Sequence, residues 1–234
     1  MPDRAKRLGR AMEAAMAQGG PDEDIDLEGP SLANARRRQV FRYLCFRPCA
    51  RVGEIGRALA LSHATVRWHE RNLLENGYLE IDGLLVFPEG LIDPSDADLF
   101  HLLTTPGRDA VLDAVTEDPG IALLELAARV GMTRQSASKI SGELADAGLL
   151  TIVEDGRFRR LYSSEALGAK REANLRRVVA FVDRLLRRLG DEGLAPELLR
   201  RDETSALLRF GAGPRRVVLD LPLDPYLTTW ARRS

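Results

Sequence analysis

The sequence predicts a mainly α-helical protein with small β wings, in which a unit of three helices and a hairpin occurs twice before a long helix and a further hairpin. Three observations support this. Residues 40–79 align with residues 111–150 without a gap, at an offset of 71. An Asp-Gly pair lies between two strand-like runs at the end of each copy. A long run of apolar residues at helical spacing follows the second copy. An internal repeat constrains the fold more strongly than a single motif does.

The two copies share the chemical character of their residues more than the residues themselves, since only six of the forty aligned pairs are identical. Apolar residues, a proline, a hydroxyl residue and a glycine recur at matching places. The pairs are Val40/Val111, Leu44/Val115, Pro48/Pro119, Val52/Leu123, Ile55/Leu126, Leu59/Val130, Leu61/Met132, Ser62/Thr133, Val66/Ala137, Leu73/Leu144, Gly77/Gly148 and Leu79/Leu150.

Three helices are expected in each unit. In the first unit they cover about residues 34–46, 52–60 and 62–76, each with apolar residues at helical spacing. Proline stops the first helix because it lacks an N–H group. Ser62 can cap the third helix through its side-chain oxygen, as Thr133 can for a helix over residues 133–147. A capped third helix after a tight turn is a helix-turn-helix.

A hairpin is expected after each third helix. The strand runs are residues 78–81 and 84–87 around Asp82-Gly83, and residues 149–154 and 157–162 around Asp155-Gly156. Asp-Gly between strands is a strong hairpin signal. Three helices with a two-stranded wing make a winged helix-turn-helix, so the sequence predicts two such domains in tandem, over residues 31–92 and 93–164.

Three short strings resemble a known family. Residues 62–69 (SHATVRWH), residues 73–79 (LLENGYL) and residues 133–139 (TRQSASK) are similar to the third-helix region of prokaryotic winged-helix repressors. The ArsR-like and MarR-like groups are nearest, and archaeal regulators with two such domains in one chain are the most similar. The resemblance covers about residues 34–162 and implies duplex DNA binding. Glu70 departs from it, because the family usually has leucine there, and an inward carboxylate needs a donor or water.

In this fold the third helix enters the major groove, and its outward side chains contact DNA. Val66, Leu73, Ala137, Ile140 and Leu144 are expected to face the core. The expected DNA-binding residues are polar or cationic: Ser62, His63, Thr65, Arg67, Trp68, Arg71, Thr133, Arg134, Gln135, Ser136, Ser138 and Lys139.

The two wings differ in chemistry. Arg157, Arg159 and Arg160 lie beside the second turn and are expected to contact the DNA backbone or minor groove. Residues 84–87, with the sequence LLVF, carry no base, so the first wing is expected to pack on a neighbouring element.

Composition is that of a globular protein, with 44% hydrophobic and 29% charged residues in a chain of 234. No apolar run reaches the roughly 20 residues of a membrane span, and residues 1–10 lack the apolar core of a secretory signal. Two cysteines suggest no disulfide framework. The protein is therefore expected to be cytoplasmic, without cofactor or metal.

The net charge of −1 hides a strong division along the chain. Residues 31–80 carry nine basic and four acidic groups, residues 81–105 carry five acidic groups, and residues 106–165 carry seven basic and ten acidic groups. Local potential, not the net value, attracts phosphate. Of the 34 cations 31 are arginine, which either suits phosphate and guanine contacts or reflects a GC-rich genome.

Some side chains have two interpretations. His69 is either a hydrogen-bonded core histidine or a switch. Trp68 either stacks on DNA or covers the core. Cys45 and Cys49 are either small buried apolar groups or a redox or metal switch.

The remaining segments flank the two units. Residues 3–18 are expected to form an amphipathic helix that contacts DNA or docks, and residues 19–30 an acidic linker. Residues 94–103 are expected to form a short joining helix.

From about residue 165 the sequence predicts a long helix whose apolar stripe comprises Leu175, Val178, Val179, Val182, Leu185, Leu186 and Leu189. Homodimerisation through residues 170–190 is favoured over docking within the chain. Residues 204–210 and 215–221 predict a hairpin that binds an effector, closes a dimer or covers the helix.

The sequence therefore predicts a DNA-binding transcriptional regulator. The rival interpretation is a protein-interaction scaffold, as tandem winged helices serve in chromosome-associated and polymerase-associated subunits, and the acidic second unit favours it. Catalysis is not expected, because the sequence has no phosphate-binding glycine loop, paired-histidine metal motif or nucleophile elbow.

Overall fold

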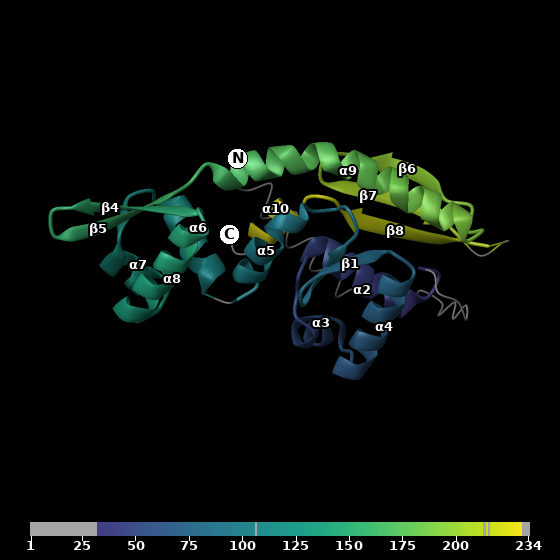
Figure 1. Cartoon of the computed structure of the whole chain (residues 1–234), viewed down its shortest axis with the longest axis horizontal. Coiled ribbons are helices and arrows are strands. Elements are labelled where there is room, and N and C mark those ends of the chain that lie inside the picture. The colour runs from purple at the N-terminus through teal and green to yellow at the C-terminus, as the bar shows by residue number, and fades with distance from the viewer. Residues whose placement is uncertain (1–31, 106, 213, 215, 231–234) are drawn as a thin grey trace.

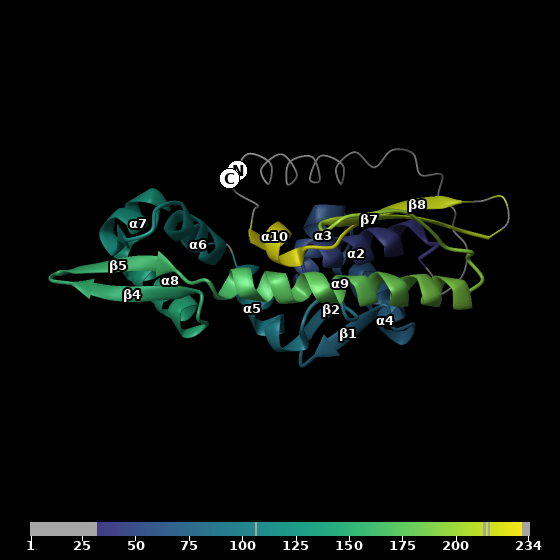
Figure 2. The same ribbon diagram turned by 90° about the horizontal axis from the view of Figure 1, so that it is seen from above.

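The computed structural model describes residues 32–105, 107–212, 214 and 216–230. Two groups of helices lie on one side of a long helix, and a three-stranded sheet runs beside one half of that helix (Figures 1 and 2). The helix expected over residues 3–18 and the linker over residues 19–30 lie outside the described residues.

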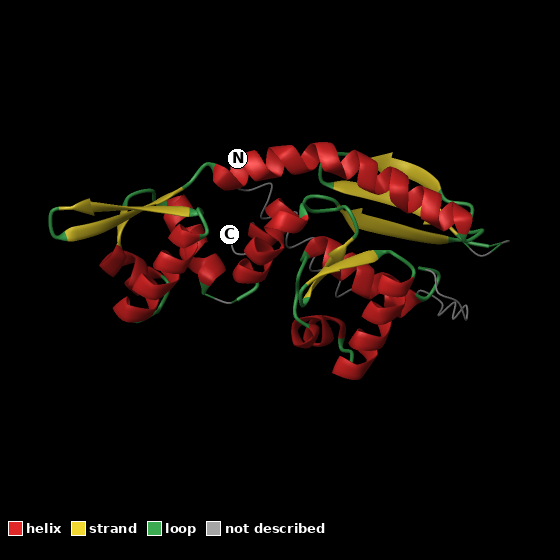
Figure 3. Cartoon of the chain, in the orientation of Figure 1, coloured by secondary structure: helices red, strands yellow, loops and turns green. Residues whose placement is uncertain are grey.

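The two groups have the same order of elements (Figure 3). The first comprises α2 (Ala35–Phe46), α3 (Val52–Leu59), α4 (His63–Glu75), β1 (Leu79–Asp82) and β2 (Leu85–Pro88). The second comprises α6 (Arg108–Glu117), α7 (Leu123–Arg129), α8 (Arg134–Asp146), β4 (Leu150–Asp155) and β5 (Phe158–Ser163), with the short strand β3 (Ile121–Ala122) added beside β5.

Both third helices begin at the expected cap. Ser62 Oγ accepts a hydrogen bond from the Thr65 amide at 3.1 Å, and Thr133 Oγ1 accepts one from the Ser136 amide at 3.1 Å. A side-chain oxygen at this position satisfies a backbone N–H that the helix itself leaves without a partner.

Both hairpin turns lie one residue later than expected. Asp82 pairs with Leu85 and Asp155 pairs with Phe158, so the central turn residues are Gly83-Leu84 and Gly156-Arg157. Only the glycine of each turn has positive φ, 57° and 58°. A turn of this kind needs glycine at its first central position, because that residue has positive φ, and it accepts other residues at the second central position. The glycine therefore begins each turn, and the aspartate before it remains in the strand.

Most of the second strand of the first wing packs against the core, as the sequence predicted. Phe87 is buried and Leu85 and Val86 are half-buried against the core. The expectation is wrong for Leu84, which is 94% exposed, because this residue lies in the turn and not in the strand.

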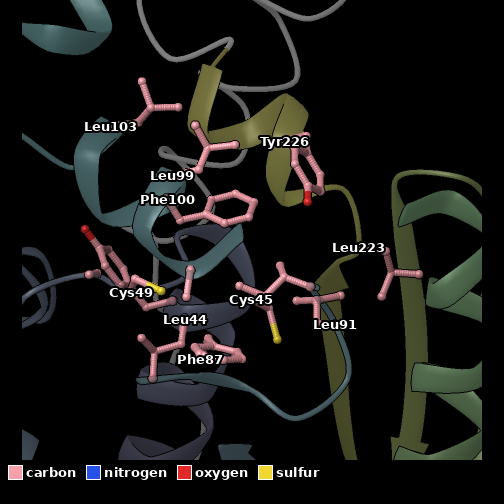
Figure 4. Close-up of a cluster of buried hydrophobic side chains, with 14 of the residues drawn as sticks. Leu44, Cys45, Cys49, Phe87, Leu91, Leu99, Phe100, Leu103, Leu223 and Tyr226 are labelled. Atoms are coloured by element: carbon pink, nitrogen blue, oxygen red, sulfur yellow. The ribbon is translucent and has the colours of Figure 1, made fainter. Parts of the chain in front are cut away.

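The joining helix forms where expected, as a 3-10 turn η1 (Pro94–Asp96) followed by α5 (Ala97–Leu103). Its side chains lie beside the first group and α10 (Pro225–Trp230): Figure 4 shows Leu99, Phe100 and Leu103 with Leu44, Phe87 and Tyr226. The sequence placed the boundary between the two units before this helix, at residue 92.

After the second group come α9 (Ala166–Asp191), β6 (Glu197–Arg201), β7 (Ser205–Phe210), β8 (Val217–Pro222) and α10 (Pro225–Trp230). The sheet is antiparallel with strand order β6-β7-β8. A hairpin alone was expected at β7 and β8. The sequence did not predict strand β6, because it is an exposed edge strand whose residues do not alternate between apolar and polar.

The apolar stripe of α9 is buried within the chain, which removes the argument for dimerisation through residues 170–190. Val178, Val182, Leu185 and Leu189 are buried, Leu175 and Leu186 are half-buried, and only Val179 of the predicted stripe is exposed, at 43%. The helix runs along the sheet in both views (Figures 1 and 2). The inward residues of β7 and β8 join the same core: Ala206, Leu208, Phe210, Val217, Leu219 and Leu221.

A row of cations on α9 faces the acidic segment that follows the first wing. Its ion pairs are Lys170–Asp96, Arg177–Asp93 at 2.5 Å, Arg184–Glu89 at 3.3 Å and Arg188–Glu89 at 2.8 Å. These pairs are partly exposed and each adds little stability alone. Together they connect the segment that follows the first wing to α9 along much of the length of the helix.

The C-terminal end of α9 also contacts the turn that ends α4. Arg188 lies over the Tyr78 ring, 5.4 Å from its centroid, and Tyr78 donates a hydrogen bond to Glu192 at 2.8 Å. Gly77 has φ 67°, and a Cβ there would lie 2.8 Å from Arg188 Nη2. The equivalent residue of the second group, Gly148, has φ 73° but no neighbour within 4 Å.

These two glycines give a matched test of the contact. Gly148→Ala should lower the free energy of unfolding by about 1–2 kcal/mol, the cost of left-handed alanine. Gly77→Ala should cost about 1 kcal/mol more, because Arg188 must leave Glu89 and Tyr78. Urea denaturation of both variants measures the difference, and equal losses would show that Arg188 moves aside without cost.

Candidate nucleic-acid interface

The outward face of α4 carries the side chains expected there. Ser62, His63, Arg67 and Arg71 are exposed and Thr65 is half-buried, while Val66 and Leu73 are fully buried. The imidazole of His63 also lies against α3, because a Cβ at Gly53 would be 3.3 Å from its Nε2 atom.

The outward face of α8 is similarly open. Thr133, Arg134, Gln135 and Ser136 are exposed, and the Lys139 side chain is 79% exposed with only a 4.0 Å approach to Glu143. Ser138 is half-buried and accepts a hydrogen bond from Arg159 of the wing at 3.5 Å. Ala137 and Leu144 are buried and Ile140 is half-buried, so α8 is oriented as its sequence predicted.

The second wing brings Arg157 and Arg159 close to α8. Arg157 is exposed, with its guanidinium 5.5 Å from the centroid of the Phe158 ring. Arg159 pairs with Glu154 at 3.0 Å. Arg160 pairs with Asp155 at 2.7 Å and donates to the Gly120 carbonyl at 3.0 Å, so its guanidinium has more contacts within the chain than that of Arg157 or Arg159.

A hollow of about 270 Å³ lies between this wing and the starts of α7 and α8. It is lined by Ala122, Leu123, Leu124, Glu125, Arg134, Arg157, Phe158 and Arg159. Leu124 is 68% exposed and Phe158 is 48% exposed. Neither residue was among the expected contact residues, since exposed apolar side chains follow no sequence pattern. The hollow combines cations with apolar surface, which suits a sugar-phosphate backbone.

Part of the positive charge of the first group is not available to a ligand. Arg37, Arg38 and Arg47 are buried. Arg38 donates to the Leu32 and Ala33 carbonyls at 3.1 and 2.7 Å. Arg47 pairs with Glu54 at 2.8 Å and donates to the Thr104 carbonyl at 3.1 Å. The exposed arginines of residues 32–80 are Arg36, Arg51, Arg57, Arg67 and Arg71.

Trp68 lies at the edge of the interface rather than inside the core. It is 52% exposed, its ring meets the His69 ring edge-on, and the Arg37 guanidinium is 5.5 Å from its centroid. His69 is buried as predicted, but its Nδ1 atom has no hydrogen-bond partner among the described residues. Burial and the nearby Arg37 and Arg36 lower the pKa of His69 to about 4, which keeps the ring neutral at pH 7.

Cys45 and Cys49 are both buried thiols and do not share a helix face. Helix α2 ends at Phe46, and Cys49 follows it with a left-handed φ of 59°. Burial raises the pKa of Cys49 to about 12 and also raises that of Cys45. Both thiols are therefore protonated at neutral pH, and they lie among apolar side chains (Figure 4).

Glu70, where the family resemblance fails, points inward and is only 8% exposed. Burial raises the pKa of its carboxyl group to about 7, and Arg67 opposes this shift. The equivalent residue Ser141 is also buried, and its hydroxyl has no hydrogen-bond partner among the described residues. Both third helices thus have a polar group where a leucine would pack.

Comparison with known families gives one match: residues 110–151 match the family described as winged helix-turn-helix DNA-binding. This segment holds α6, α7, α8 and the start of β4. No curated protein matches the chain. No helix among the described residues is long and apolar enough to cross a bilayer.

Two solved structures are similar in part. The PcaV transcriptional regulator from Streptomyces coelicolor, in complex with its natural ligand, is 24% identical with a TM-score of 0.28, over 56% of this chain and 82% of that one. The DIP2311 protein from Corynebacterium diphtheriae is 14% identical with a TM-score of 0.23, over 55% of this chain and 26% of that one. Scores this low establish no shared fold.

The raised pKa of Glu70 predicts a pH dependence of stability. An acid whose pKa is higher when folded stabilises the fold below its unfolded pKa of 4.5, and this contribution is lost as pH rises through about 7. The loss is on the order of 1–3 kcal/mol. Glu70→Gln should abolish it, whereas Glu75→Gln, at an exposed position on the same helix, should not. Urea midpoints at pH 5 and pH 8 test this, and an unchanged pH dependence in Glu70→Gln would contradict the assignment.

Proposed function

We propose that the protein is a DNA-binding transcriptional regulator that reads duplex DNA with its third helices. The observation that carries this proposal is the open face of α8, where Arg134, Gln135 and Lys139 are exposed beside an arginine-bearing wing. Cationic and amide side chains at the N-terminal turns of such a helix are suited to base edges and phosphates. The match of residues 110–151 to a DNA-binding family supports the same function.

The proposal extends to a tandem arrangement. The first group repeats the element order of the second, with third helices capped by Ser62 and Thr133 and ended by Gly77 and Gly148. These common features support two winged helix-turn-helix domains derived from one module, as in the archaeal two-domain regulators that the sequence resembles. The proposal assigns no reaction to the chain.

A protein-interaction scaffold is the alternative. The base-free first wing and the excess of acidic groups in residues 106–165 favour it. The exposed apolar residues Ile81 and Leu84 at the first wing are further features that a protein partner would bind. The two functions differ in one property, since a scaffold needs no affinity for duplex DNA.

Salt dependence separates the two functions. Binding to random duplex DNA should weaken as salt rises, with a logarithmic slope of about −3 or steeper if several phosphates are contacted. Arg134→Ala should make the slope shallower by about 1, whereas Arg201→Ala, at an exposed position on β6, should not change it. Fluorescence anisotropy measures both slopes. The absence of duplex binding at low salt would favour the scaffold.

Charge reversal tests the assignment of the wings. Arg159→Glu should weaken duplex binding about tenfold or more, because it replaces a phosphate-attracting group with a repelling one. Leu84→Glu should leave affinity nearly unchanged, because we assign the first wing no DNA contact. A gel shift gives both affinities. Loss of binding in a folded Leu84→Glu variant, with no effect of Arg159→Glu, would show that the wing assignment is reversed.

A further inference from the structure

The two third helices each pack on their own group and leave one face exposed. In Figure 1, α4 and α8 both lie below α9, in separate groups of helices. Their outward residues are exposed in both cases. A single chain therefore has two helices available to two separate segments of one duplex.

The two helices present different chemistry at equivalent positions. An offset of 71 residues places His63 opposite Arg134, Arg67 opposite Ser138, Trp68 opposite Lys139 and Arg71 opposite Gly142. On α4 two arginines flank an exposed aromatic ring, whereas α8 offers an arginine at its first turn and a lysine one turn later. Arginine and lysine both favour guanine, but they lie at non-equivalent positions of the two helices, and the aromatic ring of α4 has no counterpart on α8. The two helices therefore present different orders of base-reading groups to DNA.

The wings add a second asymmetry. The first wing has an uncharged tip, Gly83-Leu84, and the acidic Glu80 and Asp82 in its strand, so phosphates would be repelled from it. The second wing has Arg157 at its tip and Arg159 two residues later. Among the residues that the structure describes, arginines of a wing are therefore available on the α8 side alone.

A second chain is not needed to supply the second helix. The apolar stripe of α9 is already buried, mainly against the chain's own core. Four of its cations, Lys170, Arg177, Arg184 and Arg188, are paired with Glu89, Asp93 and Asp96. These contacts hold the first group against α9.

We propose that one chain binds a bipartite duplex site with two unlike halves, α4 contacting one half without its wing and α8 contacting the other together with the β4–β5 wing. This inference rests on the proposed function. It adds the number of chains per site and the asymmetry of the site, neither of which follows from DNA binding alone.

Selection from random duplexes tests the inference. Duplexes of about 40 base pairs accommodate two major-groove segments one helical turn or more apart. The full chain should select two different sequence segments at a fixed spacing, and sedimentation should give one chain per duplex. Footprinting of the DNA should show that the protected region extends past the segment contacted by α8, where the β4–β5 wing lies. It should not extend past the segment contacted by α4.

Paired variants assign each half. Arg67→Ala with Arg71→Ala should remove the sequence preference at one segment, and Arg134→Ala with Lys139→Ala should remove it at the other. Each pair should lower affinity for the selected site about tenfold or more. The control pair, Arg176→Ala with Arg187→Ala, removes the same charge from exposed positions of α9. It should leave the sequence preference at both DNA segments unchanged. Circular dichroism establishes that each variant is folded.

The outcomes distinguish this inference from the function on which it rests. A palindromic or single-segment site, two chains per duplex, or binding without sequence preference would overturn the bipartite inference and leave duplex binding intact. Failure of the unaltered chain to bind any duplex at low salt would overturn both.

Discussion

The burial of one face of α9 is the constraint on which the rest of the structure depends. Val178, Val182 and Leu185 join the core formed by β7 and β8, so the longest apolar surface of the chain is satisfied internally. The burial of a leucine or valine side chain contributes about 1.5–3 kcal/mol, and this exceeds any single ion pair on the same helix. The first group packs into the same core, with hydrogen bonds from Arg42 to the Asp220 carbonyl and from Thr228 to the Phe46 carbonyl, and the ion pairs that follow its wing add to this contact. The outward faces of both third helices remain uncovered.

The arginines of the chain have two distinct uses. Some are structural: Arg38 and Arg47 are buried and donate to carbonyl groups, and Arg188 joins α9 to the end of α4. Others, including Arg67 and Arg134, project from the third helices into solvent. The planar guanidinium suits both uses, because it donates several hydrogen bonds in fixed directions. The number of arginines therefore overstates the charge available to DNA, and their exposure is the better guide.

The sequence predicted the elements whose signals are local. Ser62 and Thr133 gave the helix starts, and periodic apolar residues gave α4, α8 and α9. It failed where the outcome depends on distant contacts or on a single dihedral angle. The turns shifted by one residue because only one left-handed glycine was required. The packing of α5 depends on a distant segment, since Phe100 contacts the Tyr226 ring of α10. The stripe of α9 resembled a dimer interface because a covering sheet cannot be inferred from the helix sequence alone. Leu124 and Phe158 were missed because exposure of apolar residues has no sequence pattern.

Hydroxyl-radical footprinting of the protein tests most directly whether these uncovered surfaces are the ones that meet DNA. Trp68 on α4 and Phe158 on the second wing are 52% and 48% exposed, and Leu199 and Val218 on the sheet are 40% and 55% exposed. Addition of a bound duplex should slow oxidation of Trp68 and Phe158 and leave Leu199 and Val218 unchanged. Protection confined to the sheet, with Trp68 and Phe158 still oxidised at their original rates, would contradict the account.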